Sequence, residues 1–201
     1  MVRSPNGWGV FGGLFDPPHI GHLIIAQHVR EEFNLGKIIF IPAGNPPHKT
    51  GSAPFIHRLR MIRLAVRGDP DFLVSSVEGG MRGKTYTIDV IKGLKRRCHR
   101  PLYLIIGADQ WREIQTWKNP RGILQQARLI IVPRPGYPIV RFPSLPTSRI
   151  FKSAAPLIDI SSTMVRERIG SKRSVRYLIP DPVNRYIMNH GLHRIWTRAH
   201  K

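Results

Sequence analysis

Two histidines three residues apart are the feature of this sequence most able to do chemistry. The run GGLFDPPHIGH (12–22) ends in His19 and His22, after two glycines and an Asp-Pro turn. If a helix begins near His19, this spacing places both imidazoles on one face of its first turn. A helix N-terminus offers free amides and about half a positive charge, and Gly12 and Gly13 let the backbone approach a ligand closely. The run predicts a phosphate site in which both histidines donate hydrogen bonds.

The histidine pair could also be structural or could bind a metal. A plain strand–helix turn with one core and one surface histidine would give the same HxxH spacing, but the length and predicted position of the run favour phosphate binding. Zinc sites usually add further His, Cys or carboxylate ligands at short spacing. Only Asp16 offers such a group near His19 and His22 in the sequence. We therefore expect no metal bound by the protein itself.

A second segment with a helix start follows much later in the chain. ISSTMVRERI (160–169) has serines where a helix should begin. Ser161 or Ser162 can cap that helix, and its free amides together with Arg166 would form a second anion site. A capped helix with a solvated basic face is the alternative, and it is what we expect of Arg168. The pairing with the histidine run favours a functional Arg166.

The elements that must position these residues alternate between strand and helix. Short apolar, β-branched-rich segments predict strands at 8–13, 37–42, 72–77, 101–107 and 128–133. Apolar residues at three- and four-residue spacing predict helices at 21–33, 56–66 and 87–97. This alternation predicts an α/β fold, a Rossmann-like, doubly wound parallel sheet with helices on both faces. Such sheets bind ligands beyond the carboxyl ends of their strands.

The remaining segments complete one expected domain over residues 1–201, with a core at about 8–192. A Pro/Gly-rich stretch at 133–156 is expected to form an irregular crossover. ISSTMVRERI and DPVNRYIMNHGL predict a short C-terminal helical extension, followed by a basic tail at 194–201.

The composition is that of a folded protein with an unusual charge. Hydrophobic residues make up 41% of the 201 residues, which excludes a disordered chain. Lys and Arg number 32 against 12 Asp and Glu, a formal net charge of +20. Such a field attracts nucleic acid, acidic membrane surfaces and phosphorylated small molecules alike.

The lone cysteine and the lack of long apolar runs bear on location. Cys98 has no second cysteine to pair with, so a reducing compartment is expected and a zinc site of thiolates is excluded. No secretory signal is visible, and the apolar runs are far shorter than the ~20 residues of a membrane helix. We expect a cytoplasmic protein without a membrane partner.

The two segments together resemble the signatures of the nucleotidylyltransferase superfamily, which includes the class I aminoacyl-tRNA synthetases. GGLFDPPHIGH resembles the H-x-G-H signature, and ISSTMVRERI resembles the second one. Further segments narrow the resemblance to bacterial nicotinate-nucleotide adenylyltransferases over about residues 9–192: IPAGNPPHK, EGGMRGKTYTIDV, IIGADQW, ARLIIVPRPG and YLIPDPVNRYIMNHGL.

The resemblance implies an activity and a set of site residues. Members transfer the adenylyl group of ATP to nicotinate mononucleotide, releasing pyrophosphate, in NAD biosynthesis. It implies that the catalytic residues are His19, His22 and Arg166. It implies contacts to ATP from Gly12, Gly13, Phe15, Lys49, Gly107, Asp109, Ser161 and Ser162. It implies contacts to nicotinate mononucleotide from Thr85, Tyr86, Asp109, Trp117 and Arg134, with Trp117 stacking on the pyridine ring.

The reactants fix what the protein must supply. The second pKa of a phosphate monoester is about 6, so the acceptor is mostly dianionic at neutral pH and needs no general base. Positioning and electrostatic stabilisation should carry catalysis. Mg²⁺ is expected on the phosphates of ATP, without a dedicated protein site.

The sequence departs from the family pattern, and other functions stay open. Many members have Thr or Ser where this chain has Leu14, so we expect backbone amides to replace that hydroxyl contact. Nicotinamide mononucleotide or phosphopantetheine is the alternative acceptor. From a different class, the chain could be a nucleic-acid-binding module, although its basic residues are dispersed in sequence and no reader motif appears. The charge makes nonspecific polyanion binding possible, and the oligomeric state stays open.

Overall fold

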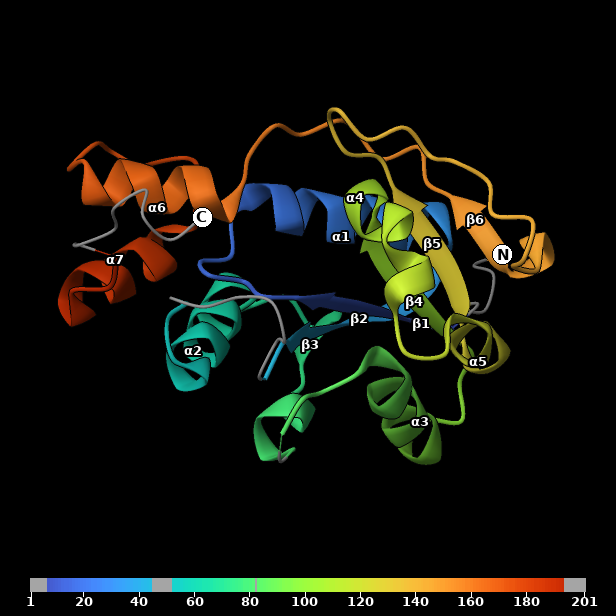
Figure 1. The fold of residues 1–201 in the computed structure, drawn as a ribbon. Coiled ribbons are helices and arrows are strands. Elements are labelled where there is room, and N and C mark those ends of the chain that lie inside the picture. Colours follow the sequence, from blue (N-terminus) through green and yellow to red (C-terminus); the bar gives the residue numbers. More distant parts are fainter. Residues whose placement is uncertain (1–6, 45–51, 82, 194–201) are drawn as a thin grey trace, which may run out of the picture.

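The parallel sheet predicted from the alternating elements is present. The computed structural model describes residues 7–44, 52–81 and 83–193 (Figure 1). In these residues, six parallel strands pair in the order β3-β2-β1-β4-β5-β6. The strands are β1 (Gly7–Gly13), β2 (Leu35–Pro42), β3 (Phe72–Val74), β4 (Leu102–Gly107), β5 (Arg128–Val132) and β6 (Ile150–Lys152).

Helices connect the strands and extend the chain beyond β6. They are α1 (Ile20–Glu32), α2 (Phe55–Ala65), α3 (Thr87–Arg97), α4 (Ala108–Arg112), α5 (Pro120–Gln126), α6 (Ser162–Gly170) and α7 (Asp181–His190). Short 3-10 turns lie at η1 (Val77–Gly80), η2 (Ile114–Thr116) and η3 (Thr147–Arg149). The helices at 21–33, 56–66 and 87–97 are thus confirmed, whereas α4 and α5 were not predicted.

The strand order places a ligand crevice at the ends of β1 and β4. From β1 the chain builds outward through β2 and β3, and it then returns to the other side of β1 with β4. Strand order therefore reverses between β1 and β4, and the crossovers on either side of this point diverge. Ligands of open parallel sheets bind at such a switch point.

Both faces of the sheet are buried, which explains the continuous apolar runs of the strands. On β2, Ile39 and Ile41 pack in the cluster formed with α3, α4 and α5. Ile38 and Phe40 point to the opposite face and pack with α1 and α2. Successive side chains of a strand alternate between faces, so a strand covered on both sides needs apolar residues at every position.

The C-terminal helical extension has a small core of its own. Val165 and Ile169 of α6 pack with Val183 and Ile187 of α7 and with Met61 of α2. Figure 1 shows these three helices gathered at one end of the sheet. The extension is therefore fixed to the rest of the fold through α2.

Two strand predictions were inaccurate. Strand β3 ends at Val74, short of the predicted 77, because Val77 already begins the turn η1. Strand β6 lies inside 133–156, where only an irregular crossover was predicted. It is a three-residue edge strand paired with β5, too short to show an alternating pattern among the surrounding Pro and Gly. The basic tail 194–201 lies outside the described residues.

No helix within the described parts of the chain is long and apolar enough to span a membrane.

Candidate active site

The two predicted histidines lie together at the start of α1. His19 is the N-cap residue of this helix, which begins at Ile20 as predicted. The centroids of the His19 and His22 rings are 3.7 Å apart, with an angle of 33° between the ring planes. A Cβ on Gly21 would lie 3.0 Å from Nδ1 of His19, so the glycine between the histidines leaves room for this arrangement.

A hydrogen bond decides which nitrogen of His22 carries the proton. The backbone N–H of His19 donates to Nδ1 of His22 over 3.1 Å. In a neutral imidazole one nitrogen accepts and the other carries hydrogen. The proton of neutral His22 is therefore on Nε2, which is left as a donor for a ligand.

Both imidazoles are uncharged at neutral pH. Burial, with a smaller contribution from the charge of Arg134, lowers the pKa of His19 to about 3. Burial also holds the pKa of His22 well below its ordinary value, with smaller contributions from His19 and Arg134. The histidines therefore offer N–H donors to phosphates without carrying a formal charge in the free site.

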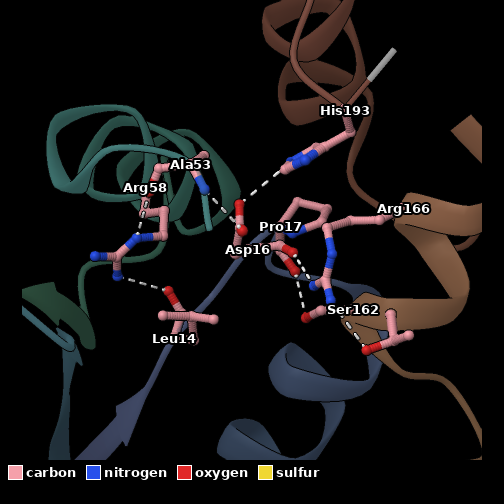
Figure 2. Close-up of polar contacts among 9 residues, drawn as sticks. Leu14, Asp16, Pro17, Ala53, Arg58, Ser162, Arg166 and His193 are labelled. Carbon is pink, nitrogen blue, oxygen red and sulfur yellow. Dashed lines mark hydrogen bonds and ion pairs between the residues drawn. The ribbon is translucent and has the colours of Figure 1, made fainter. Parts of the chain in front are cut away.

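The turn between β1 and α1 buries an ionised carboxylate. Asp16 has 0% of its surface exposed. Its Oδ2 accepts the N–H of Ala53 at 3.0 Å, and its Oδ1 lies 3.2 Å from Nε2 of His193 (Figure 2). Burial acts to raise the pKa of Asp16, but His193, the Ala53 N–H and the charge of Arg166 together lower it below its ordinary value. The carboxylate thus stays charged inside the protein.

Arg58 of α2 ties three chain segments to this turn. Its guanidinium donates to the carbonyl oxygens of Leu14 at 3.1 Å and Ala53 at 2.9 Å (Figure 2). It also donates to the carbonyl oxygen of Gly44 at 3.3 Å. These carbonyls lie just beyond β1, just beyond β2 and just before α2. Sequence analysis missed Arg58, although an arginine four residues before the buried Ile62, on the same helix face, was a usable signal.

The second predicted segment packs against the first. Ser161 caps α6, because its Oγ accepts the N–H of Met164 at 3.1 Å. The hydroxyl of Ser162 donates to the carbonyl of Pro17 at 2.8 Å. The start of α6 is therefore bonded directly to the Asp-Pro turn that precedes the histidines.

Arg166 makes the same connection from inside α6. Its Nη1 donates to the carbonyl of Asp16 at 2.7 Å, and its Nη2 donates to Oγ1 of Thr163 at 3.1 Å (Figure 2). The side chain is buried, whereas Arg168 bonds the carbonyl of Ser174 near the surface. The structure places Arg166 at the histidine turn, and its contact with a phosphate stays a prediction.

The ends of β4 and β5 add Gly107, Asp109 and Arg134. Gly107 precedes α4, and a Cβ there would lie 2.2 Å from Oδ1 of Asp109. A side chain at position 107 would displace this carboxylate from where it folds back over the turn. Oδ2 of Asp109 lies 3.8 Å from Nε of Arg134. The charge of Arg134 also lowers the pKa values of the two histidines. The ends of β4 and β5 therefore place their polar side chains beside the histidines, at the switch point.

A cavity of about 310 Å³ opens beside the histidine turn. The predicted site residues on its wall are Gly12, Gly13, Thr85, Tyr86 and Trp117. Sequence analysis missed Glu78, which lines the same wall. Its Oε2 accepts the hydroxyl of Thr85 at 2.6 Å and the N–H of Gly44 at 2.9 Å. An acidic residue in a segment otherwise rich in Gly, Arg and Lys was the available signal.

Two aromatic side chains, Tyr86 and Trp117, line the cavity near α3. Tyr86 is the N-cap residue of α3, as the predicted helix start requires. Nζ of Lys118 lies 4.4 Å from the centre of the Tyr86 ring and 3.2 Å from Oδ2 of Asp89. Trp117 directly precedes this lysine and is packed against the core from one side. A flat ligand ring bound in the cavity would therefore lie beside the aromatic side chains of the cavity wall.

Phe15 and Leu14 lie just before the histidines and take different positions. Phe15 is 1% exposed as a whole residue and packs on His22 at a centroid distance of 5.0 Å, so its side chain is part of the core behind the histidines. Leu14 lines the cavity while its carbonyl is bonded to Arg58. Lys49, the remaining predicted contact to ATP, lies outside the described residues.

No protein metal site is visible in residues 7–44, 52–81 and 83–193. Across these ranges, no three His, Cys, Asp or Glu side chains lie close enough to hold an ion.

The class of protein follows from the family model that the chain matches. A family described as cytidylyltransferase-like matches residues 10–168, which include the histidine run, the β4 end and Arg166. The chain therefore belongs to the cytidylyltransferase-like family.

Curated relatives define a narrower group. A protein of Thermus thermophilus named probable nicotinate-nucleotide adenylyltransferase is 42% identical over 92% of this chain and 98% of its own length. A protein of the same name from Thermomicrobium roseum is 39% identical over 92% of this chain and 91% of its own length. These relatives confirm the family resemblance drawn from the sequence motifs.

Solved structures confirm the fold. The nicotinic acid mononucleotide adenylyltransferase of Plasmodium falciparum, solved in complex with NaAD, superposes with a TM-score of 0.78. The match covers 94% of this chain and 98% of that chain at 18% identity.

Lowering the pH should destabilise the protein through the buried histidines. The unfolded chain binds protons at these histidines below pH 6.5, but folded His19 does so only near pH 3. The free energy of unfolding should therefore fall, as the pH drops below 6.5, by up to ~1.4 kcal/mol per pH unit for each of the two histidines. Urea denaturation at several pH values measures this slope. His22→Asn should reduce it, and the exposed His99→Asn should leave it unchanged; equal slopes in all three proteins would contradict the burial effect.

Replacing Arg58 by lysine should cost stability. A single ammonium cannot reach the carbonyls of Leu14, Gly44 and Ala53 together, so buried acceptors lose their donors. We expect Arg58→Lys to lower the free energy of unfolding by about 2–4 kcal/mol. The exposed Arg60→Lys on the same helix is the control and should change it by less than about 0.5 kcal/mol. If both variants unfold at the same urea concentration, Arg58 does not hold the turn.

Proposed function

We propose that this chain transfers the adenylyl group of ATP to nicotinate mononucleotide, forming nicotinate adenine dinucleotide and pyrophosphate. The observation that carries the proposal is the closely packed His19–His22 pair, which lies at the N-terminus of α1 and at the switch point of the sheet. The cavity beside it, with Tyr86 and Trp117 on its wall, has the aromatic surface that a pyridine ring requires.

The reaction is a single displacement at phosphorus. A phosphate oxygen of nicotinate mononucleotide attacks the α-phosphorus of ATP. The bond from that phosphorus to the oxygen bridging to the β-phosphorus breaks, and pyrophosphate leaves with its electrons. The attacking phosphate is already mostly dianionic at neutral pH, so the protein needs no base. It has to hold two anions together and stabilise the charge that grows on the leaving group.

The histidines suit this task because they are donors held in place. Nε2–H of His22 is fixed by the bond between its Nδ1 and the His19 N–H. The free amides at the start of α1 add donors of the same kind. We assign His19 and His22 to the phosphates of ATP, with Arg166, Ser161 and Ser162 completing the site from α6.

The remaining predicted contacts divide between the two substrates. Gly107 and Asp109 lie at the β4 end, where we place the adenosine ribose. Arg134 stands between Asp109 and the histidines and is assigned to the phosphate of the mononucleotide. Thr85 and Tyr86 lie at the helix start that would face the nicotinate carboxylate.

The proposal also covers where Mg²⁺ binds and in which cellular compartment the protein works. Mg²⁺ binds readily to substrate phosphates with few protein ligands, so we place it on ATP. The described residues form no site for the ion itself, and no step is derived through it. The single cysteine, Cys98, is buried and free, in keeping with a reducing cytoplasm.

A direct assay of acceptors tests the activity. Purified protein is incubated with ATP, Mg²⁺ and, in turn, nicotinate mononucleotide, nicotinamide mononucleotide or phosphopantetheine. We expect pyrophosphate release to be fastest with nicotinate mononucleotide. Faster release with either of the other acceptors would contradict the assigned acceptor and indicate a different nucleotidylyltransferase activity. No release with any acceptor would contradict the proposed activity as a whole.

His22 should be required for turnover. Removing one donor to a developing oxyanion typically lowers kcat by about 10²–10³, and we expect this of His22→Ala. His22→Asn keeps an acceptor for the His19 N–H but lacks the Nε2–H, so it should be impaired to a similar degree. Steady-state kinetics at saturating ATP measures both variants. Full turnover in a folded His22→Asn protein would show that Nε2–H does not act on the phosphates.

Acceptor choice should depend on Thr85 and not on Trp117. The two pyridine acceptors differ by a carboxylate against a neutral amide, and stacking on Trp117 does not distinguish their rings. Trp117→Ala should raise KM for both acceptors by a similar factor. Thr85→Asp should selectively lower kcat/KM for nicotinate mononucleotide by charge repulsion. Thr85→Ser, which keeps a hydroxyl for Glu78, is the control; an unchanged acceptor ratio in folded Thr85→Asp would refute this pocket assignment.

A further inference from the structure

A second groove lies between α2 and α7, outside the site already described. It has a volume of about 680 Å³. Side chains of both helices line it: Ile56, Leu59, Arg60, Arg63, Leu64, Arg67, Pro182, Arg185, Tyr186, Asn189 and His190. Arg58 of the same helix points the other way, toward the histidine turn. The groove therefore occupies the outer face of α2, for which neither the proposed reaction nor its substrates have a use.

The charge on this groove is uncompensated. Arg60 and Arg63 of α2 form a row with Arg67, which lies two residues beyond the helix end, and Arg185 faces them from α7. Across the described residues, none of these four guanidinium groups forms a hydrogen bond or an ion pair. Neither Asp nor Glu is present among the lining residues. Three of these arginines are near neighbours in sequence, and folding brings Arg185 to them from α7.

The groove also has aromatic and apolar surface. The rings of Tyr186 and His190 stack with a centroid distance of 4.0 Å and an interplanar angle of 29°. The Tyr186 hydroxyl lies 2.9 Å from Nδ1 of His57, which fixes the ring against α2. Ile56 is 64% exposed on the same wall. A rigid ring pair beside a row of cations can contact flat bases and phosphates together.

We propose that the groove between α2 and α7 binds single-stranded nucleic acid. Arginine forms paired hydrogen bonds with phosphate and stacks on planar rings, and aromatic side chains stack on bases without regard to sequence. Arg60 and Arg63 lie about 4.5 Å apart along the helix axis, and Arg67 continues the row past the helix end, so the row spans more than one phosphate step of a strand. The +20 net charge disfavours a second copy of this chain as the occupant. An acidic peptide would leave the stacked rings unused.

A matched pair of charge-reversal variants tests the location. The probe is a fluorescein-labelled oligouridylate of about 15 nucleotides, followed by fluorescence anisotropy at about 50 and 200 mM NaCl. The groove variant combines Arg60→Glu, Arg63→Glu and Arg67→Glu. The control combines Lys95→Glu, Arg96→Glu and Arg97→Glu at the exposed end of α3, and it changes the net charge by the same amount. Circular dichroism establishes that both variants are folded.

We expect the groove variant to bind the probe at least about 30-fold more weakly at low salt, with the salt slope reduced by ~2, since three phosphate contacts are lost. The control should weaken binding by less than about 3-fold. Equal weakening in both variants would mean that total charge, and not this groove, binds the probe. That result would overturn the proposal.

A third variant and a competitor test whether bases contribute. His190→Ala should weaken binding by about 5-fold or more without changing the salt slope, because it removes stacking and not a phosphate contact. Inorganic polyphosphate of equal phosphate number should compete less well than unlabelled oligouridylate. Equal competition by polyphosphate would overturn the assignment to nucleic acid. These measurements use no nucleotide substrate, so their outcome is independent of the proposed transferase activity.

Discussion

The carboxylate of Asp16 has no exposed surface, so every group that compensates its charge comes from the protein. The Ala53 N–H and His193 bind it directly, while Arg166 acts from α6 and Arg58 holds the neighbouring carbonyls. An unsatisfied buried polar group costs about 1–3 kcal/mol, and more when it is charged. Docking of these segments therefore stabilises the turn before α1, and this turn positions the two histidines that follow it. The geometry of the site is therefore a tertiary property of the whole fold.

The same network joins the two sides of the proposed site. The Gly44 carbonyl accepts from Arg58, which holds the histidine turn, while the Gly44 N–H donates to Glu78, which holds Thr85 on the cavity wall. One peptide segment beyond β2 thus connects the phosphate side to the acceptor side. Rigid supporting contacts of this kind keep reacting groups in place, which is what a reaction driven by positioning needs.

The features that sequence analysis found are those with a local pattern. Periodicity located five strands and three helices, and the HIGH and ISST runs marked two helix starts that proved to be neighbours. The features that it missed have their partners far away. Arg58 and Glu78 act through backbone groups of other segments, and His193 bonds a residue at the opposite end of the chain. Arg60, Arg63 and Arg67 are near neighbours in sequence, but only the packing of α2 on α7 brings Arg185 to them. No spacing rule encodes such contacts.

Arg166 meets the Asp16 carbonyl across 150 residues, and His193 meets its carboxylate from further still. During synthesis the first strands and helices emerge long before these partners do. A growing chain can therefore form much of its sheet while the buried turn still lacks its C-terminal contacts. The histidines reach their final arrangement only when α6 and α7 have left the ribosome and docked. A partly synthesised chain can thus contain the strands of the sheet while it still lacks the C-terminal contacts that complete the histidine site.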